Sequence, residues 1–136
     1  MTRAEDFPAK HSGNAVQQDA MDWSVLDAFT MLQKPGTQDL RVRLMTIFLK
    51  SSQPQMEGIK AAIIASDREL LTISAHTLKT ACLSIGAIKL GAICAKLEQI
   101  GRFQDLQDVG DLPTLAVEQY EAVTAAIGEA LLQSGK

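Results

Sequence analysis

His76 lies in a predicted helix, on the face opposite the apolar residues, so its imidazole is expected to be exposed. The sequence around it reads Ala75-His76-Thr77-Leu78-Lys79-Thr80 and lies in a stretch with helical periodicity. On a helical wheel the apolar positions of this stretch fall within about 40° of one direction, and His76 lies about 140° from it. These apolar positions are Leu71, Ala75, Leu78, Cys82 and Ile85. The ring is therefore expected to face away from the side of the helix that is buried.

A second face of the same helix carries Lys79, Thr72, Thr80 and Leu83 beside the histidine. A solvent-facing ring with an ammonium group one turn along suits a histidine that carries a phosphoryl group and presents it to another protein. The Lys79 ammonium could neutralise phosphoryl oxygens. Most helix lysines are simply solvated, so the residues alone leave both interpretations of Lys79 open. The mixture of hydroxyls and one exposed leucine is what a small docking patch would contain.

Glu98 is the group predicted to orient the ring. We assume that the next helix packs antiparallel after a turn near Ala87. The residue numbers of two facing positions then add up to about 174, which places Glu98 opposite His76. Its carboxylate could then accept a hydrogen bond from Nδ1–H and leave Nε2 unprotonated, as the nucleophilic nitrogen. An ordinary solvated glutamate is the alternative, and the spacing does not decide between the two.

The N-terminal half of the sequence predicts a tail followed by short helices. Residues 1–21 are polar and aperiodic, so we expect a mobile tail in which His11 is a bystander. Asp22 would cap a helix with Val25, Leu26, Phe29 and Leu32 inward, ended by residues 34–36. A helix over residues 37–51 follows, with Leu40, Leu44, Ile47 and Phe48 on one face. Residues 52–54, ending in Pro54, predict a break before a further segment over residues 56–65.

The C-terminal half predicts the remaining helices. Ser66 and Glu69 match a capping box, so a helix should start at about Asp67 and end at Gly86. The next helix is expected over residues 87–100, with Leu90, Ile93, Cys94 and Leu97 inward and Gly101 as its end. After a polar connection over 102–110, Asp111 and Pro113 open a last helix with Leu115, Tyr120, Val123, Ile127 and Leu131 inward. The predicted fold is all-α: an up-down-up-down four-helix bundle over residues 22–134 with an additional short N-terminal helix.

Composition excludes several classes of function. The chain has 136 residues and a net charge of −3, without the basic run that nucleic-acid binding needs. Its apolar stretches are too short to span a membrane, and no secretory signal is evident, so we expect a cytoplasmic protein. We also expect the chain to be a monomer. Cys82 and Cys94 lie on apolar stripes and are expected to be buried reduced thiols. The histidines and carboxylates lack the spacing of a metal or haem site.

Residues 75–98 resemble the characteristic sequence of histidine-containing phosphotransfer (HPt) domains. The matching elements are His76, Leu78, Lys79, the Gly86-Ala87 pair, Cys94 and Leu97-Glu98. The similarity extends over roughly residues 22–131. It implies a four-helix core whose histidine accepts a phosphoryl group from a receiver-domain aspartate and passes it to another receiver.

The resemblance also implies roles for single residues. His76 would be the phosphoacceptor, Lys79 the cation near the phosphate and Glu98 the ring-orienting group; Thr72, Thr80, Leu83 and Ala87 would contact the partner. Where the family usually has glycine, this chain has Thr80. Receiver domains and a hybrid histidine kinase are the implied partners, with Mg²⁺ held by the receiver and no cofactor on this chain. The protein would have no kinase activity of its own.

Two other functions remain open from the sequence. His76 to Ala81 also resembles the phosphoacceptor box of sensor histidine kinases, although Thr77 and Ala81 replace its acidic residue and proline. The chain could then be the dimerisation fragment of such a kinase. Alternatively, the bundle could be a helical adaptor that binds receivers without phosphotransfer. Neither the pathway nor whether the chain is free-standing or the end of a hybrid kinase follows from the sequence.

Overall fold

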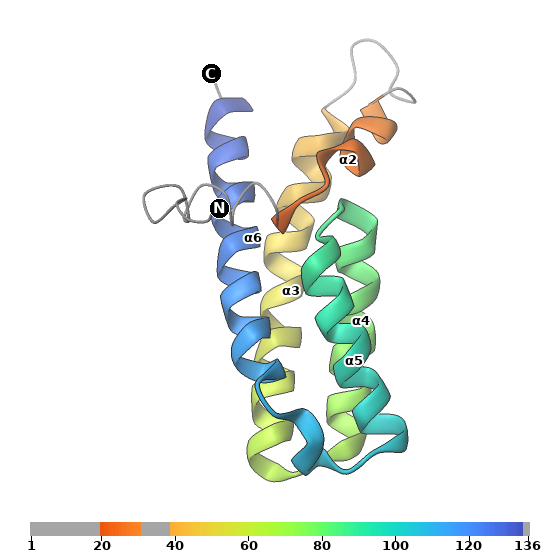
Figure 1. Cartoon of the computed structure of the whole chain (residues 1–136). Coiled ribbons are helices and arrows are strands. Elements are labelled where there is room, and N and C mark those ends of the chain that lie inside the picture. The colour runs from red at the N-terminus through yellow and green to blue at the C-terminus, as the bar shows by residue number, and fades with distance from the viewer. Residues whose placement is uncertain (1–19, 31–38, 135–136) are drawn as a thin grey trace, which may run out of the picture.

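The computed structural model describes residues 20–30 and 39–134, which form an elongated helical bundle (Figure 1). Its elements are α2 (Trp23–Thr30), α3 (Leu40–Ala65), α4 (Arg68–Ile85), α5 (Ile88–Phe103), the short 3₁₀ helix η1 (Leu106–Val109) and α6 (Leu112–Ser134). Helices α3 to α6 run alternately up and down, and each contacts its neighbours around the bundle. Helix α2 packs across one end against α3 and α4. The predicted all-α bundle with a short N-terminal helix is confirmed.

The predicted break at Pro54 is wrong, because α3 runs through it without interruption. Proline removes one backbone donor and leaves the carbonyl of Lys50 without its helical partner. Both residues are exposed, so water can bind that carbonyl. The opposite side of α3 buries a continuous stripe across the proline, made of Met45, Phe48, Ser52, Met56, Ile59 and Ala62. Packing of this stripe stabilises one long helix despite the proline.

The N-cap of α4 is Asp67, one residue later than the predicted cap Ser66, and the helix begins at Arg68. Ser66 ends α3 in a left-handed conformation with φ of 54°, and it is Asp67 that caps α4, its carboxylate accepting from the Leu70 backbone N–H at 3.1 Å. The other end is as predicted. Gly86 caps α4 with φ of 93°, a conformation that favours glycine. Its carbonyl accepts from the Asp22 N–H at 2.7 Å, which ties the start of α2 to the α4–α5 turn.

Gly101 does not end α5, which continues to Phe103. The glycine is buried where α5 crosses α4: a Cβ at this position would meet the Thr72 hydroxyl and lie 3.1 Å from the Thr72 backbone nitrogen. The carbonyl of Gly101 also accepts from Arg68 Nε at 3.3 Å. The residue is therefore a close-approach site between two helices, and the sequence suggested a helix stop only because glycine serves both purposes.

The core follows most of the predicted apolar positions. All five apolar positions of α4 are buried, whereas Ile47 of α3 and Leu115 of α6 are exposed, contrary to prediction. The smaller Ala116 is buried in place of Leu115. The expected tail also ends earlier than residue 21, since Ala20 and Met21 belong to the core. His11, Leu32 and residues 34–36 lie outside the described residues.

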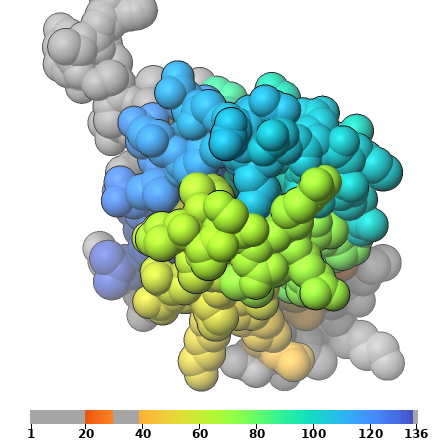
Figure 2. Space-filling view, turned by 90° about the horizontal axis from the view of Figure 1, so that it is seen from below, coloured from red at the N-terminus to blue at the C-terminus, as the bar shows by residue number. Residues whose placement is uncertain are grey.

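The lower end of the bundle is closed by two connections that lie side by side (Figure 2). One is the α3–α4 turn and the other is the α5–α6 connection with η1, which packs on α5. Within the bundle, the buried Ser52 hydroxyl is 2.9 Å from Tyr120 Oη, joining α3 to α6. In the part of the chain that the structure describes, no helix combines the length and the apolar character needed to cross a membrane.

Cys82 and Cys94 are free thiols in the core, as expected. A hydrogen bond between them, together with burial, raises the pKa of the Cys82 thiol. Both side chains therefore act as small neutral residues at the α4–α5 contact.

The close approach at Gly101 gives a prediction about stability. Gly101→Ala should lower the free energy of unfolding by about 1–3 kcal/mol, because its methyl group overpacks against Thr72. Gly128→Ala, in α6, is the matched control: nothing lies within 4 Å of a Cβ there, so alanine should stabilise the helix by about 0.5–1 kcal/mol. Urea unfolding of both variants measures the difference. Equal effects of the two substitutions would contradict the helix-crossing role of Gly101.

Candidate phosphoacceptor site

His76 lies on the outward face of α4, as its position on the helix predicts. Its side chain is 52% exposed, while Ala75 and Leu78 on the buried face are fully covered. The histidine is therefore not part of the core. A partner can reach the ring without any rearrangement of the bundle.

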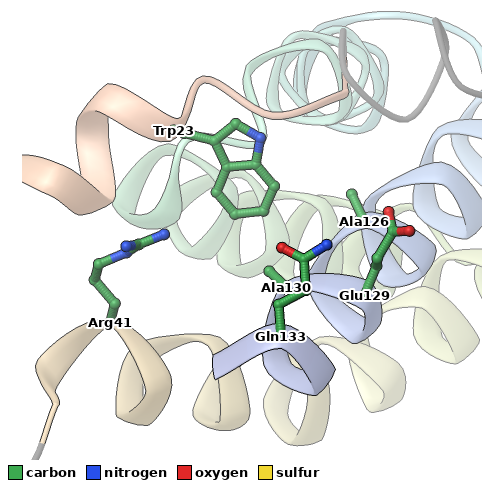
Figure 3. Close-up of a pocket in the computed structure, with 6 residues that line it drawn as sticks. All are labelled: Trp23, Arg41, Ala126, Glu129, Ala130 and Gln133. Atoms are coloured by element: carbon green, nitrogen blue, oxygen red, sulfur yellow. The ribbon is translucent and has the colours of Figure 1, made fainter. Parts of the chain in front are cut away.

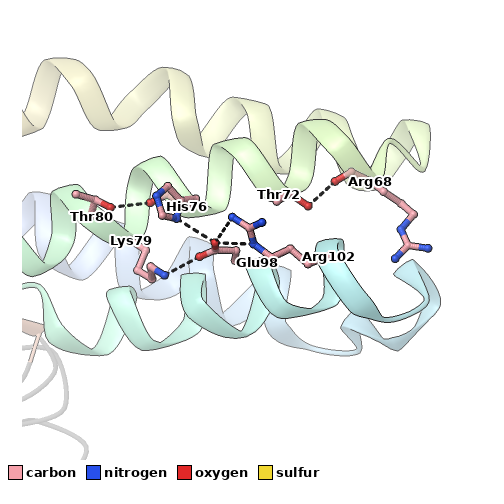
Figure 4. Close-up of polar contacts among 7 residues, drawn as sticks. All are labelled: Arg68, Thr72, His76, Lys79, Thr80, Glu98 and Arg102. Atoms are coloured by element: carbon pink, nitrogen blue, oxygen red, sulfur yellow. Dashed lines mark hydrogen bonds and ion pairs between the residues drawn. The ribbon is translucent and has the colours of Figure 1, made fainter.

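Glu98 of α5 lies directly against this ring (Figure 4). Nδ1 of His76 is 3.0 Å from Glu98 Oε2, which confirms the contact predicted from the hairpin register. The Glu98 side chain is only 8% exposed, and it is the one charged residue that is buried in residues 20–30 and 39–134. The alternative that Glu98 is an ordinary solvated residue is wrong.

Two cations neutralise the buried carboxylate. Lys79 Nζ is 2.7 Å from Oε1, and Arg102 approaches Oε2 with Nε at 2.9 Å and Nη2 at 2.8 Å. Burial raises the pKa of the Glu98 carboxyl, but the contacts with Lys79, Arg102 and His76 outweigh burial and bring it down to about 2. Glu98 is therefore ionised at neutral pH and can only accept hydrogen bonds.

In the neutral ring, this arrangement favours one tautomer of His76. A carboxylate at Oε2 favours the form with the proton on Nδ1, which donates to Glu98. Nε2 then carries a lone pair on a ring that is half exposed. An imidazole held in this way can act as a nucleophile toward an electrophile brought by another molecule.

Arg102 is the one member of this network that the sequence analysis missed. The helix was predicted to end at Ile100, which would place Arg102 in a loop. Because α5 continues to Phe103, Glu98 and Arg102 are four residues apart on one helix, and such pairs face each other. The signal was present in the sequence, but the wrong helix end concealed it.

The residues predicted to contact a partner differ in their accessibility. Thr80 is exposed, and Leu83 is 50% exposed on the same face. Thr72 is half-buried against Gly101, with its hydroxyl donating to the Arg68 carbonyl at 2.9 Å. Ala87 is fully buried, so its predicted partner contact is wrong: the turn packs it into the core. Ile73, which is 55% exposed, is an apolar residue of this face that the prediction omitted.

A pocket of about 310 Å³ opens elsewhere on the molecule, between α2, the start of α3 and the end of α6 (Figure 3). Trp23, Arg41 and Glu129 are among its lining residues, and His76 is not. No cluster of three or more His, Cys, Asp or Glu side chains that could hold a metal ion occurs in the described ranges.

The low pKa of Glu98 gives a prediction about acid stability. Its pKa is 4.5 ordinarily and about 2 in the folded protein, so the ionised carboxylate stabilises the fold above about pH 4.5. This contribution should diminish as pH falls below 4.5 and vanish below about 2. Wild type should therefore lose its stability advantage over Glu98→Gln in that interval, measured by urea unfolding at each pH. Glu118→Gln, at an exposed carboxyl of α6, is the control and should differ little from wild type throughout.

Comparisons with known proteins agree with this geometry. The family model described as the Hpt domain matches residues 43–130. The crystal structure of histidine-containing phosphotransfer protein B (HptB) from Pseudomonas aeruginosa PAO1 is similar, with a TM-score of 0.75 and 23% sequence identity. The match covers 84% of this chain and 96% of that one. A search of curated proteins finds no match. Because the family model spans more than half of the sequence, the chain belongs to the Hpt domain family.

Proposed function

We propose that this protein is a phosphorelay intermediate, in which His76 accepts a phosphoryl group from a receiver-domain aspartate and passes it to another receiver. Membership of the Hpt domain family supports the phosphotransfer role. One observation carries the assignment of the site: Nδ1 of a half-exposed histidine is bound to a buried carboxylate, at 3.0 Å. That contact leaves Nε2 as the nucleophile on the accessible side.

In the proposed transfer, the Nε2 lone pair attacks phosphorus in line with the bond to the aspartate oxygen. The N–P bond forms, the O–P bond breaks, and the aspartate leaves as a carboxylate with the bonding electrons. The transition state is loose, so positioning and charge supply most of the catalysis. The ring becomes positively charged as Nε2 bonds to phosphorus, and the adjacent Glu98 carboxylate stabilises that charge.

The partner would supply the remaining groups. A receiver would bring its aspartyl phosphate and the Mg²⁺ that neutralises phosphoryl oxygens, so this chain would need no cofactor. Lys79 is 27% exposed, and its ammonium contacts Glu98, the residue that is bound to His76 (Figure 4). We propose that it also offsets charge on the incoming phosphoryl group. Such an encounter would take place in the cytoplasm.

The apolar and hydroxyl residues around His76 would form the docking surface. Leu83 and Ile73 flank the ring along α4, each about half exposed. A groove of about 200 Å³ between α3 and α4, lined in part by Ile47, Ala81 and Ser84, adjoins this face. Exposed apolar side chains grouped near a reactive residue are typical of an interaction surface.

The protein should have no kinase activity of its own. Incubation with ATP and Mg²⁺ alone is expected to leave His76 unmodified, because phosphoryl transfer from a nucleotide needs groups that cradle its phosphates. Label acquired from ATP alone would instead favour the histidine-kinase fragment.

The phosphoacceptor assignment predicts a specific loss of labelling. Wild type incubated with a radiolabelled, phosphorylated cognate receiver should acquire acid-labile, base-stable label, and His76→Gln should acquire none. Circular dichroism establishes that the variant is folded. Undiminished label in His76→Gln would refute the site, and unaltered receiver binding with no label in wild type would favour the adaptor function.

The docking surface predicts a separate effect on transfer between proteins. Leu83→Glu places a charge beside His76 and should slow transfer from the receiver by about 10-fold or more, since burying an unpaired charge at an interface is costly. Labelling by the small donor phosphoramidate, which requires no docking, should be unchanged. Ile64→Glu is the matched control, because Ile64 is 86% exposed at the far end of α3. Equal slowing by both variants would rule out a specific role for Leu83.

A further inference from the structure

Arg102 occupies a special position in the network around His76. Its guanidinium contacts the same oxygen of Glu98, Oε2, that is bound to His76 Nδ1 (Figure 4). Arg102 Nε and Nη2 lie 2.9 and 2.8 Å from this oxygen, whereas the Lys79 ammonium forms an ion pair with the other oxygen, Oε1, at 2.7 Å, without the geometry of a hydrogen bond. The carboxylate is thus held at each oxygen by a different cation, one from α4 and one from α5.

An ordinary surface ion pair does not account for this geometry. Pairs between exposed side chains contribute little and hold neither partner in one place. Here the acceptor is buried, and a buried carboxylate needs opposite charges held close to it. Arg102 is itself 46% exposed, so it closes the network on the side that faces solvent.

We propose that Arg102 is a positioning residue for phosphotransfer, which holds Glu98 Oε2 against His76 Nδ1 and thereby keeps Nε2 free of a proton. This inference rests on the proposed function of His76. Arg102 acts through Glu98, and the function needs no contact between the arginine and the phosphoryl group.

The physical reason lies in the last torsion of the glutamate side chain. Rotation about this sp³–sp² bond has broad, shallow minima, so a carboxylate is not fixed by its own rotamer. Lys79 alone would hold Oε1 and let Oε2 turn away from the ring. Two nitrogens of the planar guanidinium, Nε and Nη2, converge on Oε2 and limit this freedom, which a point charge does less well. Loss of these contacts should therefore allow both tautomers of His76.

The test uses the full chain and two kinds of measurement. The ¹⁵N shifts of the His76 ring, recorded at about pH 8 where free imidazole is neutral, report which nitrogen carries the proton. Uptake from phosphoramidate reports the reactivity of Nε2 without a receiver. Arg102→Met, which keeps the aliphatic character and the helix propensity of the side chain, should give a mixed tautomer and uptake about 10-fold slower, by analogy with the loss seen when partners that orient metal-binding histidines are removed.

Two further variants sharpen the test. Arg102→Lys restores a charge four residues from Glu98 and should recover part of both signals. Lys96→Met removes an exposed cation two residues from Glu98, on another side of α5, and should change neither signal. A purely structural role for Arg102 would lower thermal stability without altering the ¹⁵N shifts of the folded protein.

The outcomes separate this inference from the proposed function. If wild type and Arg102→Met show the same tautomer, the positioning role is overturned, whatever the uptake rates. If the tautomer changes as expected but wild type takes up no label from either donor, the positioning role stands and the phosphotransfer function fails. A mixed tautomer together with slow uptake, partly restored by lysine, supports both.

Discussion

The site depends on one buried carboxylate. The Glu98 side chain is 8% exposed, and its carboxylate contacts the side chains of His76, Lys79 and Arg102. Without these partners, burying its negative charge would cost too much free energy. The same contacts give the imidazole its orientation, because a carboxylate that is fixed in place fixes whatever donates to it. Under the proposed function, stability and reactivity have a common origin: the groups that stabilise the buried charge would also determine which ring nitrogen is free.

The α4–α5 hairpin brings these groups together. Its register is set at one end by the Gly86 turn and at the other by the close approach of Gly101 to Thr72. Between these two points the helices cannot slide without loss of packing, so His76 and Glu98 face each other although they are 22 positions apart. Helices α3 and α6 cover the inner side of the hairpin, and the polar network is left on the outer side. The rest of the bundle thus acts as a rigid support.

The outer face of α4 is more apolar than its sequence suggests. The Thr80 hydroxyl donates to the His76 carbonyl at 3.1 Å, and the Ser84 hydroxyl to the Thr80 carbonyl at 2.9 Å. Hydroxyls that bond to their own helix are less available to a partner. Together with Leu83, this leaves a surface suited to apolar contact on the same face as the His76 ring. Thr80, where the family usually has glycine, adds bulk to this surface without adding a free donor.

Helices with strong local signals could be predicted from the sequence. The apolar stripe of α4 and the glycine at its end predicted that His76 faces outward, and the register of the α4–α5 hairpin predicted Glu98 opposite it, because these features depend on periodicity and turn chemistry along one segment. Three features could be known only from the packed bundle: whether Pro54 breaks α3, whether Gly101 ends α5 and whether Ala87 is accessible. Each depends on what another helix places against the residue. Arg102 belongs with these, since its contact with Glu98 four residues before it forms on a helix that continues through Gly101, the residue that approaches Thr72.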